Sequence, residues 1–135
     1  MKKLFILGLV LLMVVVIATA ALAKADVQKL VPYPFDGAEY PDASGQAIVN
    51  DSMGDVVLEI TVSVKGLDPG VEYEVKGCTS SGVGDWTSIG FFTTNANGNG
   101  NFHINFRADD TLPPTVHIYV NLGGGNTLLM DEDYE

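Results

Sequence analysis

The feature that most constrains the fold of this chain is a strict alternation of apolar and polar residues between residues 56 and 75. Every second residue from Leu58 to Val64 is apolar, and the residues between them are polar. A period of two gives an extended strand one apolar and one polar face. Turn residues at 66–70 interrupt the pattern, which resumes from Val71 to Val75. These residues predict two antiparallel strands joined by a turn, and a second layer that covers their apolar face.

The other apolar runs after residue 45 are also short and typical of strands. Alternation and β-branched or aromatic residues predict strands at 46–50, 86–94, 102–106, 116–120 and 127–130. Gly, Asn, Asp and Pro separate these runs, and no segment has a helical period. The sequence therefore predicts an all-β domain, an Ig-like β-sandwich of about seven antiparallel strands. A small barrel is the alternative architecture.

The first 23 residues have the organisation of a secretory signal peptide. Lys2 and Lys3 precede an uncharged run from Leu4 to Ile17, and the segment ends in Ala21-Leu22-Ala23. We expect cleavage after Ala23, which would place the mature protein in an extracellular or periplasmic compartment. The same segment is long enough to remain as a membrane anchor. Membrane association is expected only if the segment is not cleaved.

Proline-rich and acidic sequence flanks the predicted strands. Residues 24–44 contain three prolines among acidic residues, and predict an extended lead-in because proline is excluded from helices and central strands. The β-sandwich domain is expected over residues 45–130. An acidic tail at 131–135 is expected to be disordered.

The chain is acidic. Its formal charge of −10 becomes −12 when Lys2 and Lys3 are removed with the leader. Nucleic acids and anionic membranes repel such a protein, so neither is expected as a partner. Carboxylates in three predicted loops could hold a divalent cation. These loop acids are Asp36/Glu39/Asp42, Asp51/Asp55 and Asp109/Asp110.

Few residues suggest catalysis or metal binding. His103 and His117 are the only histidines, and each is the polar residue of an alternating strand, so two separate surface histidines are expected. Residues 95–100 resemble the start of an EF-hand loop, but Phe106 stands where a bidentate Glu is required. A hairpin turn is predicted there instead. Residues 123–125 lack the Lys and the helix of a phosphate loop. No catalytic, cofactor-binding or metal-binding residue is assigned, and an enzyme is not expected.

Two further residues bear on modification. Cys78 is the only cysteine, so no intramolecular disulfide can form. Its thiol is either buried and unreactive or available for a bond between molecules. Asn50-Asp51-Ser52 matches the N-glycosylation sequon, which matters only in a host that glycosylates.

The segment Gly66 to Val75 resembles the Leu-x-Pro-x-x-x-Tyr-x-Val segment of fibronectin type III domains. The resemblance implies that Tyr73 forms a corner and that its hydroxyl bonds to nearby backbone. It also implies that Leu67, Pro69 and Val75 are corner and core residues. The family's usual role would be adhesion or spacing in exported proteins.

Together these features predict a secreted or cell-surface β-sandwich that acts as a non-catalytic structural or interaction module. Another surface protein or a glycan would be its partner. The alternative is a ligand-binding module for a divalent cation or a carbohydrate. Such a module would use the acidic loops with Trp86, Tyr40 or Tyr119 as an aromatic stacking platform.

Overall fold

The computed structural model of the chain describes residues 24–51, 55–79, 86–115, 117–123 and 125–133. The predicted signal peptide and its cleavage point lie outside these residues, as does Ser52 of the sequon. Within them, no helix has the length and hydropathy needed to cross a membrane.

Antiparallel strands dominate the described residues, as the sequence predicts. They are β1 (Lys24–Pro32), β2 (Ser44–Asp51), β3 (Val56–Lys65), β4 (Glu72–Cys78), β5 (Thr87–Thr93), β6 (Gly100–Arg107), β7 (His117–Leu122) and β8 (Asn126–Asp131), with a short 3-10 helix η1 (Asp36–Glu39) between β1 and β2. The all-β fold class is confirmed. Hydrogen bonds join the eight described strands into one sheet of order β5-β4-β7-β8-β1-β2-β3-β6.

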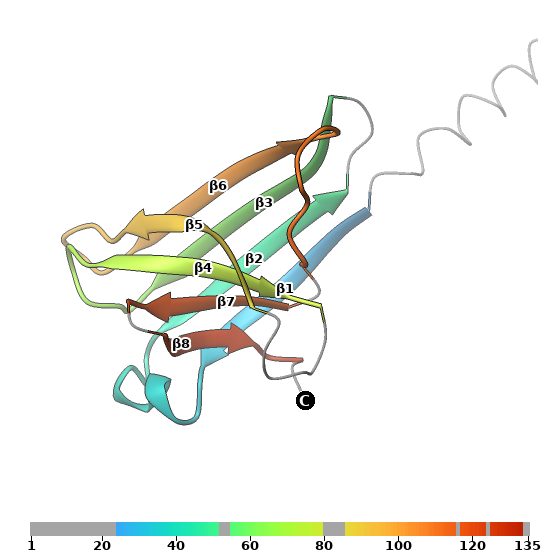
Figure 1. Ribbon diagram of the computed structural model, residues 1–135. Coiled ribbons are helices and arrows are strands. Elements are labelled where there is room, and N and C mark those ends of the chain that lie inside the picture. Colours follow the sequence, from blue (N-terminus) through green and yellow to red (C-terminus); the bar gives the residue numbers. More distant parts are fainter. Residues whose placement is uncertain (1–23, 52–54, 80–85, 116, 124, 134–135) are drawn as a thin grey trace, which may run out of the picture.

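The sheet curls so that its two halves face each other (Figure 1). β6, β3, β2 and β1 form one layer, and β5, β4, β7 and β8 form the layer in front of it. The alternating apolar residues of every strand meet between the layers in one buried core. Burial of this apolar surface is the main force that holds the layers together. A continuous sheet that turns back on itself is closer to the small-barrel alternative than to two separate sheets.

The first strand differs from the predicted boundaries. Residues 24–32, expected in the extended lead-in, form β1 in the interior of the sheet between β2 and β8. Leu30 is fully buried in the core, whereas Val27 is 56% exposed on the other face. Pro32 is the last residue of β1, so proline limits the end of this strand and not its interior.

The C-terminal boundary also lies later than predicted. Asp131, expected in the acidic tail, is the last residue of β8 and is buried. The backbone N–H of Glu132 donates to the Lys29 carbonyl at 2.8 Å. Its carboxylate pairs with the Lys29 ammonium at 2.8 Å. This end of the chain is therefore tied to β1 through residue 132.

The two strands predicted on either side of residues 66–70 are present as β3 and β4, but they do not pair with each other. β3 pairs with β2 and β6, and β4 pairs with β5 and β7. Residues 66–70 instead carry the chain from one layer to the other. Gly66 and Gly70 adopt φ values of 78° and 70°, which favour glycine. A hairpin and a crossing need the same turn residues, so the alternation alone did not distinguish them.

Tyr73 lies at this crossing and is fully buried. Its hydroxyl oxygen accepts a hydrogen bond from the Asp68 backbone N–H at 3.1 Å, which is the geometry of a tyrosine corner. Burial raises the pKa of Tyr73 above its ordinary value. Leu67 and Val75 are buried in the core, whereas Pro69 lies exposed in the turn.

Substitution of Tyr73 tests the corner. We expect Tyr73→Phe to lower the free energy of unfolding by about 1 kcal/mol, because the Asp68 N–H loses its acceptor. Tyr73→Ala should cost about 3–5 kcal/mol, because it also leaves a cavity. Tyr33→Phe, at a partly exposed position, is the control and should change little. Denaturant melts in which the Tyr73→Phe and Tyr33→Phe proteins unfold at the same midpoint would contradict the corner.

The two edge strands of the sheet, β5 and β6, meet through side chains. No ladder hydrogen bonds join them within the described residues. A Cβ atom on Gly90 would lie 2.6 Å from the ring of Phe102, and one on Gly100 would overlap the ring of Phe92. Each phenylalanine thus lies over a glycine of the opposite strand. A turn joins the two strands at the predicted position, and the Asn95 side chain accepts hydrogen bonds there from two later backbone N–H groups. The prediction of a hairpin is wrong, because the described strands β5 and β6 do not pair and the turn connects the two layers.

This contact between β5 and β6 should tolerate no added methyl group. We expect Gly100→Ala to lower the free energy of unfolding by about 1–3 kcal/mol, because the Phe92 ring must move in a packed core. Adding Phe92→Leu should recover part of that loss, since the smaller side chain leaves space. Gly123→Ala is the control, because a Cβ there meets no atom within 4 Å. Equal thermal stability of the Gly100→Ala and Gly123→Ala proteins would show that the contact is not tight.

Candidate functional site

The two histidines do not share a site. His103 lies on β6 and His117 on β7, and these strands are not neighbours in the sheet. The Nδ1 atom of His103 is 3.1 Å from the Thr61 hydroxyl. The Nδ1 atom of His117 is 2.8 Å from a carboxylate oxygen of the buried Asp131. His103 therefore interacts with the neighbouring strand β3, and His117 interacts with the last residue of the neighbouring strand β8.

The loop acids remain dispersed. Asp110 accepts a hydrogen bond from the Arg107 backbone N–H at 2.7 Å and closes the turn after β6. Across the described ranges, no three His, Cys, Asp or Glu side chains gather as metal ligands would.

Tyr40 contacts a further acid, Asp68, which lies in the turn between β3 and β4. The Tyr40 hydroxyl donates to the Asp68 carboxylate at 2.6 Å, beside the Tyr73 corner. This hydrogen bond, together with burial, raises the pKa of Tyr40 to about 12. Tyr40 also packs against the core between the layers. It is therefore part of the corner and separate from Trp86 and Tyr119.

A second hydrophobic cluster lies on the outer face of β4, β7 and β8, away from the core. We call it the outer cluster; Cys78, Tyr119 and Met130 are its buried members, and Val31, Tyr33 and Trp86 are its partly buried members. It arises from strand alternation, because β7 points Ile118 and Val120 into the core and Tyr119 outward. The register then places Lys76, Tyr119, Met130 and Val31 side by side on successive strands.

The outer cluster brings together two of the three predicted stacking residues. The rings of Trp86 and Tyr119 lie 4.3 Å apart at an angle of 35°. Tyr119 is only 1% exposed, so the partly exposed Trp86 presents the accessible ring. Phe35 is 76% exposed, and its ring lies 5.4 Å from that of Tyr33. The result is an aromatic surface supported by buried side chains.

Polar groups lie within the same outer face. The Lys76 ammonium is 3.2 Å from the Glu74 carboxylate, and both side chains are about four-fifths buried, at 20% and 18% exposure. Asn121 lies opposite Glu74 and is 1% exposed. Its side-chain oxygen has no hydrogen-bond partner among the described residues. The face can therefore combine aromatic stacking with hydrogen bonding from an ion pair.

Cys78 lies in the base of the outer cluster. Its thiol is buried, with the sulfur 3.7 Å from the Tyr119 hydroxyl. Of the two alternatives for this thiol, burial or availability for a bond between molecules, the structure shows burial. A disulfide between molecules would require the cluster to open.

Residues 31–35 contribute more to this face than an extended lead-in that packs Tyr33 and Phe35 on the domain would. Val31 and Tyr33 were placed in an extended lead-in, and their relation to Trp86 depends on the pairing of β1 with β8. The sequence carries no apolar–polar alternation over β1, because the apolar Val27 is exposed and the polar Gln28 is buried.

No family model, curated protein or solved structure matches the chain.

The Tyr40–Asp68 hydrogen bond predicts a pH dependence. Because the pKa of Tyr40 is raised to about 12, the folded protein favours the neutral phenol more than the unfolded chain does. The resulting stability is present below the ordinary value of 10.0 and is lost as the pH rises through about 12. In an ultraviolet titration of tyrosinate, Tyr40→Phe should remove one late-ionising tyrosine. The pKa of Tyr73 is also raised, so the late-ionising tyrosine that is lost in Tyr40→Phe relative to wild type is assigned to Tyr40. Loss of a tyrosine that ionises at the ordinary pH would contradict it.

Proposed function

We propose that this protein is a secreted or cell-surface domain that acts as a non-catalytic interaction module and contacts its partner through the outer cluster. The leader predicted at residues 1–23 supports export. The corner at Tyr73 is a feature that the chain shares with immunoglobulin-like domains, although its strands form one continuous sheet. Domains of that kind commonly serve adhesive or spacing roles. The partner would be another surface protein or a glycan.

The observation that carries this proposal is the aromatic surface on the outer face of β4, β7 and β8. Aromatic residues are enriched where proteins bind each other, and they often supply most of the binding energy. Here Trp86 rests on Tyr119, and Phe35 lies beside Tyr33. A ring that is already held by buried neighbours loses little conformational entropy on binding.

Carbohydrate binding is the second candidate, and the position of Trp86 favours it. Its ring is fixed on Tyr119 and remains partly exposed, which suits stacking against the apolar face of a sugar. Lys76 lies opposite Tyr119 on β4, so its ion pair with Glu74 offers donors and acceptors for hydroxyl groups on the same face. Ligand sites commonly combine an aromatic lining with a few polar groups.

The test uses the mature chain, residues 24–135, against purified cell-surface proteins and polysaccharides of the host. Trp86 is the only tryptophan, so its fluorescence reports directly on contacts at the outer cluster. Calorimetry then compares variants. We expect Trp86→Ala and Phe35→Ala to weaken binding about tenfold or more, as for interface aromatics. Leu112→Ala is the matched control, because Leu112 is 49% exposed outside the outer cluster.

Two outcomes would overturn the proposal. Binding that is unchanged in both aromatic variants would exclude the outer cluster as the contact surface. A full-length product that stays in the membrane, identified by intact mass, would contradict cleavage after Ala23 and secretion. The expected result is a secreted protein whose intact mass corresponds to residues 24–135.

A further inference from the structure

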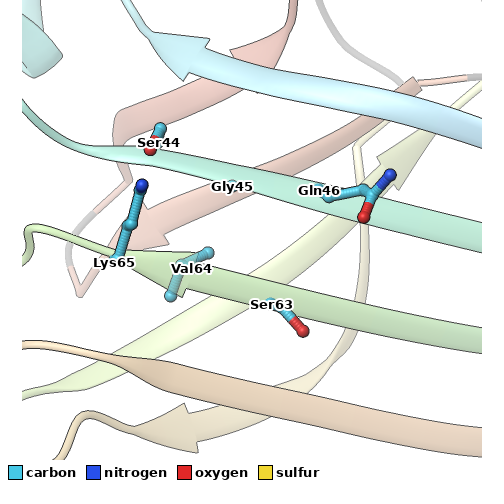
Figure 2. Close-up of a pocket in the computed structure, with 6 residues that line it drawn as sticks. All are labelled: Ser44, Gly45, Gln46, Ser63, Val64 and Lys65. Carbon is cyan, nitrogen blue, oxygen red and sulfur yellow. The ribbon is translucent and has the colours of Figure 1, made fainter.

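A shallow depression lies on the outer face of β2 and β3, in the layer opposite to the one that carries the outer cluster. Its volume is about 240 Å³, and it is lined by Ser44, Gly45, Gln46, Ser63, Val64 and Lys65. Figure 2 shows that these residues come from two adjacent strand segments, with Lys65 extending from β3 toward Ser44 on β2. None of the outer-cluster residues contributes to it.

The register of the two strands creates this depression. Ser44 pairs with Lys65, Gly45 with Val64 and Gln46 with Ser63. The polar residues of the first and third pairs point outward, whereas Val64 is buried in the core. The pair between them therefore leaves a strip of backbone that is flanked by polar side chains. The exposed floor of the depression is mostly apolar, and the polar side chains border it.

Lys65 supplies an unpaired positive charge at this position. Two other lysines have carboxylate partners, Lys29 with Glu132 at 2.8 Å and Lys76 with Glu74 at 3.2 Å. Lys65 has no carboxylate within 4.0 Å among the described residues. An exposed ammonium beside a depression without acidic lining can pair with one anionic group. This local attraction acts against the net repulsion from a chain whose formal charge is −10.

The neutral residues indicate what else the ligand carries. Ser44 and Gln46 form no side-chain hydrogen bond with the described part of the chain, so their donors and acceptors are available. The Ser63 hydroxyl donates to Asn101 at 3.0 Å and keeps its capacity to accept. A ligand rich in hydroxyl groups can satisfy all three side chains.

We infer that this depression binds a uronate, a sugar ring that carries a carboxylate. Lys65 pairs with the carboxylate, and Ser44, Gln46 and Ser63 hydrogen-bond the ring hydroxyls. A volume of about 240 Å³ is below that of pockets for drug-sized ligands and suits one small ring. One lysine matches the single charge of a carboxylate. A lysine also binds phosphate as a point charge, so the test below compares the two anions.

A sugar chain could continue along the same face. Beside the depression, cross-strand polar contacts follow β3 and β6, including Thr61 with His103 at 3.1 Å and Ser63 with Asn101 at 3.0 Å. These side chains offer further hydrogen-bonding groups to neighbouring sugar units. The inference concerns a different layer from the outer cluster and does not depend on the proposed contact there.

The test is a titration of the mature chain at low ionic strength with oligosaccharides of glucuronate, of neutral glucose and with inorganic phosphate. Amide chemical shifts locate binding, and calorimetry gives affinities. We expect the uronate oligosaccharide to bind about tenfold or more tightly than the neutral one, with shifts centred on residues 44–46 and 63–65. Lys65→Gln should weaken binding about tenfold, and Lys65→Arg should retain most of it.

Lys29→Gln is the matched control, because it removes the same charge from an exposed lysine elsewhere. Equal losses in the Lys65→Gln and Lys29→Gln proteins would reduce the effect to net charge and overturn the site. Absence of uronate binding at about 10 mM ligand would also overturn it. Phosphate binding as tight as uronate binding would exclude the sugar. Shifts centred on Trp86 would move glycan binding to the outer cluster and would support the second candidate function instead.

Discussion

The hydrogen bond between the Asp68 amide and the Tyr73 hydroxyl fixes the point where the chain crosses from one layer of the sheet to the other. Other parts of the fold are anchored to the same point. The Thr94 hydroxyl, at the end of β5, donates to the Asp68 carbonyl at 2.5 Å, and the Leu67 N–H donates to the Gly98 carbonyl at 3.2 Å. The crossing and the β5–β6 turn therefore form one hydrogen-bonded unit, which positions the two edge strands whose phenylalanines close the core.

Local patterns in the sequence predicted local structure well. The alternation from Val56 to Lys65 corresponds to β3, and the turn signal at residues 66–70 is a real turn. Long-range pairing was not predictable in the same way. The pattern around that turn is compatible with a hairpin, and only the packing of two distant layers separates β3 from β4. The prediction of an extended lead-in at residues 24–32 was wrong for a related reason. Proline excludes the interior of a central strand, but Pro32 stands at the end of β1.

The outer cluster and the depression on β2 and β3 were harder to predict than the strands, because both depend on long-range pairing. Trp86 and Tyr119 could be named as aromatic residues, but their contact depends on the order of β4, β7 and β8. Lys65 and Ser44 are far apart in sequence and meet only because β2 and β3 pair in one register. A shift of that register by one residue would turn the polar side chains toward the core. The outward chemistry of each layer therefore depends on pairing that no local pattern specifies.

The pairing of β1 with β8 has a consequence for how the molecule is made. The first described strand lies between β2 and the last strand, so the sheet is interrupted until the end of the chain is available. β1, β2, β3 and β6 can associate early, because they form a contiguous half of the sheet. The layer that contains β7 and β8 joins them through β1 only after β8 has been made. Contacts between such distant segments slow folding and leave a partly assembled sheet with open edges. Any chain that is released before residue 131 would lack the strand that connects the two halves.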